Sequence, residues 1–423
     1  MLERNTIASV LEGLADSPVL LLTGARQVGK TTLVQELSRR RPACQYLTFD
    51  DMNVLNAAKT DPAAFVAGLP GPVILDEIQR VPELFVALKA SVDRDRRPGR
   101  FVLTGSANVL ALPRLSESLA GRMELHRLWG LSQGELEGVR EGFIDALFAP
   151  RFAPPPPGPL RGAALPERIL RGGYPEVVAR QAPARRRRWF ESYLATILQR
   201  DVKELAQIED LIALPRLLAV LATRAAKLLN FADISRDCAL PQTTLKRYLA
   251  LLEMTYLVQP LPAWSANPSK RLAKAPKLLF TDTGLLAHLL GLGGREVRKE
   301  KSYGALLENF VALELLKHFG WSGTPARLRH FRTHSGLEVD LVLEDDSGRL
   351  AGIEVKASAT LHNDDFKGLR ALAETAPRKF LRGVVLYNGE QALPFGPNLW
   401  ALPLHTLWTW NTKKHPARRT KRA

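Results

Sequence analysis

The residues best suited to chemistry are two glycines, a lysine and a threonine near the N-terminus. They stand in the stretch Gly24-Ala25-Arg26-Gln27-Val28-Gly29-Lys30-Thr31, which Thr32 follows. The glycines let the backbone turn so that successive N–H groups point into one concavity. The lysine can bridge the β and γ phosphates of a triphosphate, and the threonine hydroxyl can complete the coordination of Mg²⁺. We therefore predict that residues 24–32 bind ATP together with Mg²⁺.

Two elements must position this loop. The apolar run of residues 17–23 is short enough to be a buried parallel strand, and a helical pattern begins near Lys30. The positive N-terminal end of that helix would favour a phosphate group. A loop between a strand and a helix is the setting that this phosphate-binding motif needs, and a chance glycine-rich turn would lack it.

Two further strands end in polar side chains. Residues 71–78 form an apolar run with Asp76 and Glu77 near its end. Asp76 would hold the Mg²⁺ through water, and Glu77 is placed to polarise an attacking water. Helix capping or solvation is the alternative for this acidic pair. The run 100–108 offers Thr104, Ser106 or Asn108 as a sensor of the γ-phosphate, and we select Ser106; turn chemistry would also explain these residues.

Strands that alternate with helices predict a parallel sheet in residues 1–130, with the nucleotide at the carboxyl ends of the strands. The order of loop, acidic strand and polar-tipped strand resembles the AAA-type ATPases. The segment Ser118-Leu-Ala-Gly-Arg122 is similar to a motif in one bacterial and archaeal branch of that superfamily. This resemblance makes Arg122 a candidate arginine finger or sensor, acting within its own chain or on a neighbour. A finger that acts on a neighbour would require a homo-oligomer, for which a hexameric ring is one arrangement.

Length and composition set the broader class. The chain has 423 residues, which predicts about three domains, and 46% hydrophobic residues, which is ordinary for a globular protein. Only Cys44 and Cys238 could form a disulfide, and no apolar run approaches the length of a membrane span, so we expect a cytoplasmic protein without membrane contact. The net charge of +16 favours polyanions such as DNA, although arginine-rich genomic composition is an alternative cause.

The middle of the chain predicts helices and a DNA-binding shape. Residues 131–230 are interpreted as a helical lid and connector, with a proline-rich stretch at 149–159 and four arginines at 185–188 that suit a solvated helix face or a phosphate backbone. Residues 231–295 have the pattern of a helix-turn-helix followed by a wing. The residues predicted to contact DNA are Lys246, Arg247, Lys270, Arg271 and Lys274. Packing of protein against protein is the alternative.

Residues 300–410 are expected to form an α/β domain with acidic residues gathered on it. The helical pattern at 303–319 places Glu308 on or beside the apolar stripe. Two alternating strands, 337–344 and 350–357, predict a hairpin in which Val339, Leu341 and Leu343 share one face. If Asp340 lies across from Glu354, then Glu344 lies across from Leu350. A divalent cation between the two acids, with Lys356 beside it, would relieve their repulsion and create a hydrolytic site. An ordinary solvent-facing hairpin is the alternative.

This arrangement resembles the PD-(D/E)xK nuclease fold, with Glu308, Asp340, Glu354 and Lys356 matching residue by residue. The whole chain looks like ATPases in which an AAA-type module precedes a C-terminal domain of unknown function with this nuclease-like fold. The expected fold class is therefore α/β: a parallel-sheet P-loop domain, a helical and winged-helix middle, a PD-(D/E)xK-like domain and a basic tail at 411–423.

Three hypotheses follow from these patterns. The first is an ATP-hydrolysing motor or switch that acts on DNA, similar to a helicase or translocase. The second is a metal-dependent nuclease gated by ATP. The third is a signalling ATPase whose C-terminal domains bind protein. Salt-dependent binding of the protein to DNA would favour the first hypothesis over the third.

Overall fold

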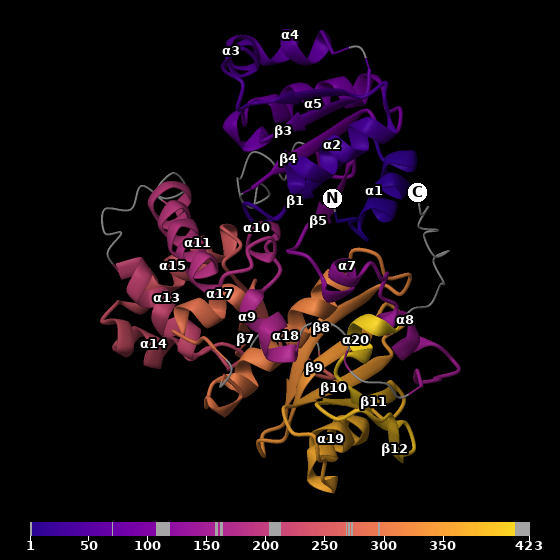
Figure 1. Ribbon diagram of the computed structural model, residues 1–423. Helices are drawn as coiled ribbons and strands as arrows, with labels where there is room; N and C mark the ends of the chain where they lie inside the picture. The colour runs from indigo at the N-terminus through magenta and orange to yellow at the C-terminus, as the bar shows by residue number, and fades with distance from the viewer. Residues whose placement is uncertain are drawn as a thin grey trace, which may run out of the picture.

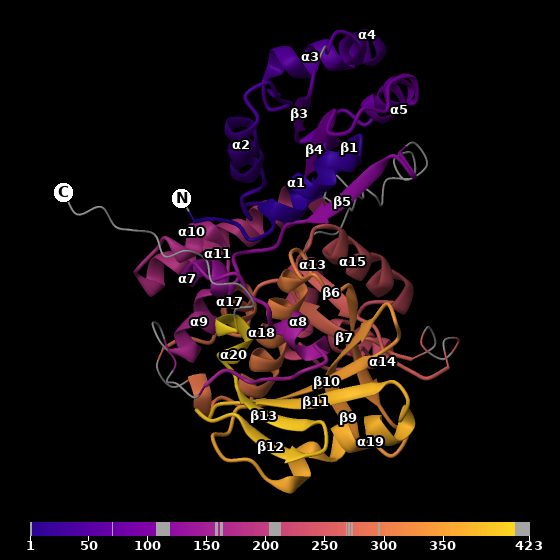
Figure 2. The same ribbon diagram turned by 90° about the vertical axis from the view of Figure 1, so that its right-hand side faces the viewer.

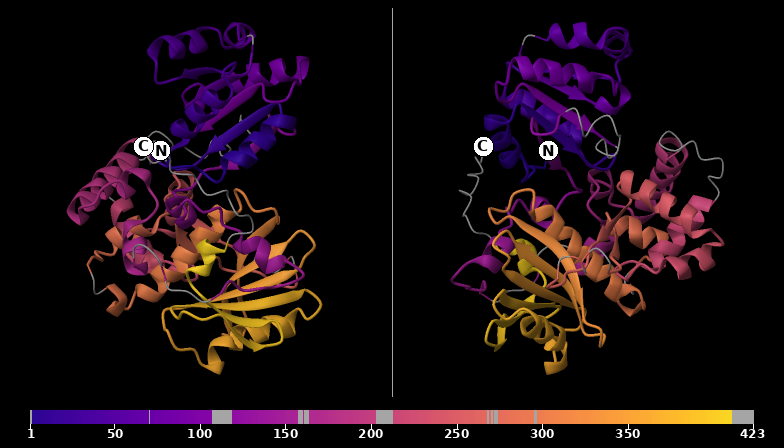
Figure 3. Two further views of the ribbon diagram at one scale, coloured as in Figure 1. Left: turned by 45° about the vertical axis from the view of Figure 1, so that its right-hand side comes forward. Right: turned by 180° about the vertical axis from the view of Figure 1, so that it is seen from behind.

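The structure is a computed structural model, and it describes residues 2–69, 71–106, 119–156, 160, 164–202, 213–267, 269, 271, 274–294 and 297–410, without the side chains of 200 and 201. These ranges form an N-terminal domain, a largely helical middle region and a C-terminal domain (Figure 1). In Figure 3 the N-terminal domain stands above the other two, which lie side by side. The basic tail predicted at 411–423 lies outside the described residues.

The N-terminal domain contains a five-stranded parallel sheet in the order β2-β3-β4-β1-β5. Its strands are β1 (Val19–Thr23), β2 (Gln45–Thr48), β3 (Val73–Asp76), β4 (Phe101–Gly105) and β5 (Met123–Arg127). Its helices are α1 (Ile7–Asp16), α2 (Lys30–Arg40), α3 (Met52–Thr60), α4 (Pro62–Ala67), the 3₁₀ turn η1 (Ile78–Arg80) and α5 (Leu84–Arg94). The predicted parallel sheet is confirmed.

Alternation along the strands explains the layers of this domain. Leu20 and Leu22 of β1 pack with α1 and α2, whereas Val19 and Leu21 pack with α3, α4 and α5. Successive side chains of a strand point to opposite faces, so a strand that is apolar throughout needs cover on both. Figure 2 shows α2 and α5 on opposite sides of the sheet. Because β4 lies between β1 and β3, the carboxyl ends of these three strands are adjacent.

The middle region begins after β5 and is almost entirely helical. Its first helices are α7 (Gln133–Glu137), α8 (Phe143–Phe148), α9 (Leu165–Arg171), α10 (Pro175–Val178) and α11 (Pro183–Thr196), which continues as a π-helical turn, η3 (Ile197–Asp201). No described helix is both long and apolar enough to cross a lipid bilayer. Cys44 and Cys238 are buried and unpaired, as the sequence predicts.

A compact unit of helices and one hairpin follows. It contains α13 (Ala213–Thr223), α14 (Phe231–Cys238), α15 (Gln242–Met254) and the antiparallel strands β6 (Val258–Leu261) and β7 (Lys277–Phe280). An isolated bridge joins Leu228 to Lys277 of β7, so the segment after α13 adds a third strand position to the hairpin. Further on are α17 (Thr283–Leu289) and the 3₁₀ turn η4 (Val297–Lys299). The helix-turn-helix order expected from residue 231 is present, and α13 packs against α14 ahead of that boundary.

The C-terminal domain contains a six-stranded mixed sheet in the order β12-β13-β11-β10-β9-β8. Its strands are β8 (Ala326–Arg332), β9 (Glu338–Asp345), β10 (Leu350–Lys356), β11 (Phe380–Tyr387), β12 (Leu393–Gly396) and β13 (Leu399–Pro403). Its helices are α18 (Tyr303–His318), the 3₁₀ turn η5 (Asn363–Phe366), α19 (Lys367–Thr375) and α20 (Thr406–Thr409). Apolar residues of α18 and α20 cover one face of the sheet, and those of α19 cover the other.

The β9–β10 hairpin confirms one prediction and corrects another. Glu344 pairs with Leu350, which is the predicted register. Leu341 and Leu343 pack with the α18 side, but Val339 packs with the α19 side, so the prediction that all three share a face is wrong. The cause is an irregularity in the β8–β9 pairing, where the register shifts by one residue and reverses the alternation of side chains beyond it.

Candidate functional site

The loop between β1 and α2 has the backbone geometry of a phosphate-binding loop. Gly24, Gln27 and Gly29 all have positive φ angles of 150°, 66° and 97°. A Cβ atom at Gly24 would lie 2.2 Å from the carbonyl oxygen of Leu128, so only glycine fits there. The helix α2 begins directly at Lys30, with its first N–H groups facing the loop.

Lys30 closes this loop on itself. Its side chain is buried, and its Nζ donates to the carbonyl oxygens of Gly24 and Ala25, at 2.8 Å each. These acceptors are neutral carbonyls of the same loop. A phosphate would offer the ammonium a full negative charge in exchange, and charge-assisted hydrogen bonds are the stronger kind. The loop therefore suits an anionic ligand that attracts Lys30 toward itself.

The loop is held from outside by residues whose role sequence reasoning missed. Arg4 donates to the carbonyl oxygen of Val28 at 2.9 Å and to that of Trp129 at 2.6 Å, and it forms an ion pair with Glu135 at 3.1 Å. The Tyr193 hydroxyl donates to the carbonyl oxygen of Arg26 at 3.4 Å. An arginine twenty residues before the motif carries no local signal, because its partners come from distant parts of the chain.

Asp76 is buried at the end of β3 and accepts hydrogen bonds from three hydroxyl groups. Its Oδ2 accepts from Thr31 at 3.0 Å and from Tyr46 at 2.7 Å, and its Oδ1 accepts from Thr104. Burial, with the hydrogen bond to Asp76, raises the pKa of Tyr46, which keeps this phenol a proton donor. The hydroxyl of Thr31 and the carboxylate of Asp76 are oxygen donors of the kind that Mg²⁺ prefers. The two residues predicted to hold the metal therefore lie together and fit it.

Glu77 and Ser106 also meet at this edge of the sheet. Glu77 has a left-handed backbone with φ of 61°, and its N–H donates to Thr104 at 3.0 Å. Ser106 donates to Oε2 of Glu77 at 3.1 Å and accepts from Nε2 of Gln79 at 2.9 Å. Gln79, which the sequence did not single out, also donates to Glu77. The candidate base is thus oriented by two side chains, while Asn108 lies outside the described residues.

Arg122 lies at the opposite end of the strands, just before the amino end of β5. It precedes β5, and Met123 pairs with Val19 at the amino end of β1. Its guanidinium forms a two-pronged ion pair with Asp93, with distances of 2.5 and 3.1 Å. The five residues of β1 place the phosphate loop about 15 Å away. Contact between Arg122 and the nucleotide loop of the same chain does not fit this arrangement.

Another arginine, Arg127, lies at the carboxyl end of β5, where it pairs with Thr23 just before the loop. It stacks on Trp129, with 3.8 Å from its guanidinium carbon to the ring centroid, and lies 4.8 Å from the Tyr256 ring. It also donates to the side chain of Gln259 in β6. Burial lowers the pKa of Arg127 to about 10. Arg127 therefore connects the carboxyl end of the parallel sheet, where the nucleotide is expected, to the segment that follows α15.

The residues predicted to contact DNA fall into two groups. Lys246 and Arg247 lie on the exposed face of α15, with Lys246 above the Phe231 ring. Arg271 instead forms a forked ion pair with Glu344 of β9, at 2.8 and 2.9 Å, and Lys274 donates to the backbone of Arg332 at 3.0 Å. Lys270 lies outside the described residues.

The predicted wing packs on the C-terminal domain. The N–H of Trp264 donates to the carbonyl oxygen of His330 at 2.6 Å, and the N–H of His330 donates to that of Pro262 at 3.0 Å. The Trp264 ring is fully buried among residues of the C-terminal sheet. The expectation that this wing and Arg271 face DNA is therefore wrong: aromatic burial and an ion pair hold them against β8 and β9.

The predicted acidic residues of the C-terminal domain are brought together. Glu354 accepts from the N–H of Asp340 at 2.9 Å, and Asp340 accepts from the N–H of Val355 at 3.0 Å. Lys356 lies 3.6 Å from Glu354. Lys277 of β7, which the sequence did not assign to this site, lies 2.6 Å from Glu308 and 3.5 Å from Asp340. We call Glu308, Asp340 and Glu354 the carboxylate cluster.

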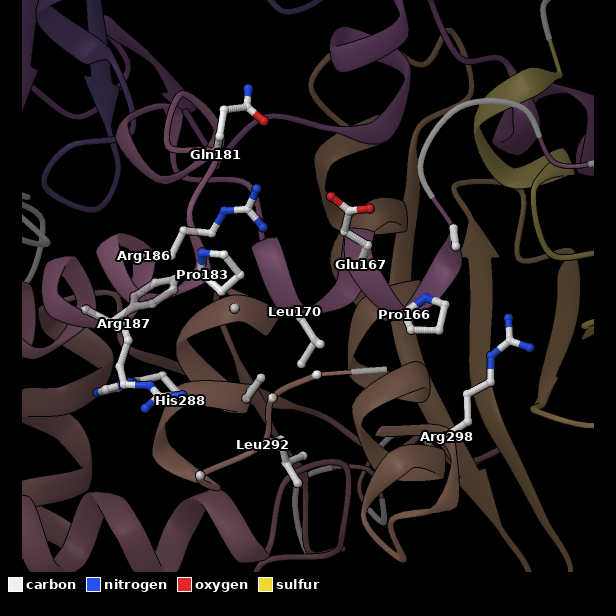
Figure 4. Close-up of a pocket in the computed structure, with 17 residues that line it drawn as sticks. Pro166, Glu167, Leu170, Gln181, Pro183, Arg186, Arg187, His288, Leu292 and Arg298 are labelled. Atoms are coloured by element: carbon white, nitrogen blue, oxygen red, sulfur yellow. The ribbon is translucent and has the colours of Figure 1, made fainter. Parts of the chain in front are cut away.

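A cavity of about 920 Å³ lies between α9, α11 and α17. Figure 4 shows Arg186 and Glu167 approaching it from two sides and Arg298 at one end. Arg187 also lines it, so two of the four consecutive arginines border this cavity and the other two are exposed. Its lining is more cationic than anionic, which suits an anionic group.

The fold and the loop geometry are those of a P-loop ATPase domain. The family profile described as "AAA domain" matches residues 16–137. Two profiles described as domains of unknown function, DUF8612 and DUF4143, match residues 162–296 and 303–407. The three matches follow the three structural regions.

The chain belongs to the same family as two mycobacterial proteins. The "Uncharacterized protein Rv2008c" of Mycobacterium tuberculosis and "Uncharacterized protein Mb2031c" of Mycobacterium bovis are each 33% identical over 409 residues, which are 96% of this chain and 84% of each relative. An uncharacterized protein of Haemophilus influenzae is 25% identical over 261 residues, 58% of this chain and 57% of the relative.

Two solved structures show weaker similarity. The Walker-type ATPase PABY2304 of Pyrococcus abyssi is 16% identical with a TM-score of 0.41, covering 68% of this chain and 96% of that one. The RuvB Holliday junction branch migration motor of Thermotoga maritima is 18% identical with a TM-score of 0.30, covering 64% and 94%.

Proposed function

We propose that the protein hydrolyses ATP with Mg²⁺ and uses the cycle to act on DNA. The observation that carries this proposal is the position of Arg127 between the end of β1, where the phosphate loop begins, and the segment after α15. Arg127 pairs with Thr23 and lies 4.8 Å from the ring of Tyr256, two residues after the end of α15, which is the helix that exposes Lys246 and Arg247. A change at the phosphates can reach a basic surface through one buried side chain.

Each residue of the nucleotide site has a role that its position supports. Lys30 would leave its loop carbonyls for the phosphates, and Thr31 with Asp76 would hold the metal. Bound Mg²⁺ would neutralise charge on the β and γ phosphates. Glu77, held by Ser106 and Gln79, would accept the proton of the attacking water. Ser106 contacts this base directly, so it could report whether the γ-phosphate is present.

The DNA-binding part rests on a smaller surface than the sequence predicts. The unit from α13 to β7 has the winged-helix order of elements, but its wing is packed on the C-terminal domain. Lys246 and Arg247 on α15 therefore carry the expected contacts, and they would meet phosphates without reading sequence. The net charge of +16 supplies a general attraction to polyanions.

The test is ATP hydrolysis with and without duplex, single-stranded and four-way branched DNA, each at low and high salt. We expect one DNA form to raise turnover in wild type. The variant Lys246→Glu/Arg247→Glu should lose this stimulation and reduce the salt slope of binding by about 2. The control Arg378→Glu/Lys379→Glu makes the same charge change on an exposed loop of the C-terminal domain and should keep both.

If no form of DNA changed the rate of ATP hydrolysis, the proposal that the protein acts on DNA would be wrong. The signalling hypothesis would then lead. Hydrolysis itself would remain a separate result: loss of turnover in Lys30→Ala tests the nucleotide site without reference to DNA.

We also propose that the active form is a homo-oligomer in which Arg122 reaches a neighbouring nucleotide. Arg122 lies at the amino end of the strands, away from the phosphate loop of its own chain. This position supports a contact with the nucleotide of a neighbouring chain. Mixing Arg122→Ala chains with Glu77→Gln chains should restore hydrolysis, because each chain supplies what the other lacks. Mixtures no more active than either variant alone would contradict this arrangement.

A further inference from the structure

The carboxylate cluster contains a buried cation from another part of the chain. Lys277 belongs to β7 of the middle region, is 3% exposed, and points into the C-terminal domain. Its Nζ lies 2.6 Å from Oε1 of Glu308 and 3.5 Å from Oδ1 of Asp340. Glu308 comes from α18 and Asp340 from β9, so the ammonium joins three separate elements.

The sequence pattern of this domain implies a divalent metal at the same acids. Mg²⁺ requires oxygen ligands at about 2.0–2.1 Å and near-octahedral geometry. An ion bridging Glu308 and Asp340 would have to share the space that the ammonium fills, with two positive centres in near contact. The residues around these acids therefore do not fit a metal while Lys277 is in place.

Lys277 cannot easily withdraw, because its strand is fixed on both sides. The backbone of Phe280 in β7 donates to Oδ1 of Asn309 at 2.8 Å and accepts from its Nδ2 at 2.9 Å. Asn309 follows Glu308 in α18 and is fully buried. On the other side β7 pairs with β6 and with Leu228. The lysine is thus built into the junction between the middle region and the C-terminal domain.

We propose that the ammonium of Lys277 takes the place of the metal, so that the carboxylate cluster is a metal-free ion cluster that joins β7 to the C-terminal domain. A divalent-cation site exists there only when this ammonium is removed. The C-terminal domain in the intact chain consequently binds no Mg²⁺ or Mn²⁺ at Asp340 and does not cleave DNA through these residues.

The charges of the cluster agree with this assignment. Burial would lower the pKa of Lys277, but the carboxylates of Glu308 and Asp340 outweigh it and raise the pKa, so the lysine stays charged. Burial, together with the charge of Asp340, raises the pKa of Glu354 to about 8. Burial and the charge of Asp340 also raise the pKa of Glu308 well above its usual value. Acids that hold protons need no divalent cation to relieve their repulsion, and the ammonium of Lys277 accompanies the negative charge that remains.

The test is Mn²⁺ binding to the full chain, measured by electron paramagnetic resonance without nucleotide. We expect wild type and Asp340→Asn to bind the same amount of Mn²⁺, with no site that depends on Asp340. Lys277→Met keeps an unbranched side chain that is one atom shorter and uncharged, and it should gain one Mn²⁺ per chain. The double variant Lys277→Met/Asp340→Asn should lose that ion again.

Two results would overturn the proposal. One is saturable binding of Mn²⁺ by wild type that Asp340→Asn abolishes, and this measurement does not depend on the folding of any Lys277 variant. The other is a Lys277→Met protein with a native circular dichroism spectrum that gains no ion. Neither result bears on ATP hydrolysis, which is measured at the N-terminal domain.

Discussion

Two buried lysines, Lys30 and Lys277, stand in sites of opposite character. Lys30 is held by two neutral carbonyl oxygens of its own loop, at 2.8 Å each. Lys277 is held by two carboxylates from separate elements, at 2.6 and 3.5 Å. The first lysine gains charge-assisted contacts when a phosphate arrives, whereas the second already has them.

The difference teaches how one residue type can either prepare a site or fill it. An ammonium on neutral acceptors can leave at little cost when an anion binds. An ammonium between carboxylates leaves uncompensated buried charge behind, which is among the most expensive changes in a protein interior. The N-terminal site is therefore ready for a ligand, and the C-terminal cluster is complete as it stands.

The largest expected effect is on hydrolysis at the first site. Glu77→Gln keeps the contacts with Ser106 and Gln79 but removes the base, so we expect kcat to fall by about 10²–10⁴-fold. Nucleotide binding should persist, because Lys30 and Thr31 are intact. Steady-state turnover and equilibrium binding of a fluorescent ATP analogue measure the two quantities. Unchanged turnover would remove Glu77 from the proposed mechanism.

Stability sharpens the contrast between the lysines. Lys277→Met leaves Glu308 and Asp340 buried without their cation, so we expect the free energy of unfolding to fall by about 3–5 kcal/mol. Lys30→Met, the matched control, removes the contacts with the two neutral carbonyls and should cost about 1–2 kcal/mol. Urea unfolding of both variants provides the comparison. Equal losses would mean that the two ammonium groups are held alike.

The pH dependence of stability tests whether the cluster is free of metal. Burial, with the charge of Asp340, raises the pKa of Glu354 from 4.5 to about 8 in the folded chain. Between pH 4.5 and 8, Glu354 binds its proton more tightly in the folded state than in the unfolded state. The protonated Glu354 therefore adds to the free energy of unfolding below pH 4.5, and this contribution is lost as the pH rises to 8. Its share of the slope is at most about 1.4 kcal/mol per pH unit.

Glu354→Gln keeps an oxygen for the Asp340 N–H and should remove this share of the slope. Unfolding measured from pH 5 to 8 checks it. If the free energy of unfolding changed with pH in the same way in wild type and variant, the pKa of Glu354 would not be raised. A bound metal that keeps Glu354 ionised would give that result.

The smallest expected effect concerns Tyr46, whose hydroxyl lies 2.7 Å from Asp76. Tyr46→Phe removes one donor while Thr31 and Thr104 keep their contacts, so we expect a change of about 1 kcal/mol, or about five-fold, in the Mg²⁺ concentration that supports half-maximal hydrolysis. Titration of Mg²⁺ at fixed ATP measures it. A change above a hundred-fold would mean that Tyr46 itself belongs to the metal site.

A feature could be predicted from the sequence when the residues that form it are close together along the chain. The phosphate loop, the acids after β3 and the register of the β9–β10 hairpin depend on contiguous residues, so spacing alone predicts them. Arg4, Gln79 and Arg127 could not be assigned, because their partners are set by the packing of distant segments.

The wing and Lys277 show the same limit in the middle region. Basic residues at 270–274 predict contact with a polyanion, but Arg271 instead faces a carboxylate of the C-terminal domain, as does the nearby Lys277. Composition cannot tell an external anion from an internal one. Arg122 was placed by resemblance, and only the parallel order of strands reveals that it stands at the opposite end of the strands.

The most direct measurement is the number of Mn²⁺ ions bound per chain by paramagnetic resonance, first without nucleotide and then with a non-hydrolysable ATP analogue. We expect no Asp340-dependent ion in the absence of nucleotide and one additional ion per chain in its presence. That additional ion should be lost in Lys30→Ala and unaffected by Asp340→Asn. An ion that binds without nucleotide and disappears in Asp340→Asn would contradict the proposal, because the second lysine would then not fill its site.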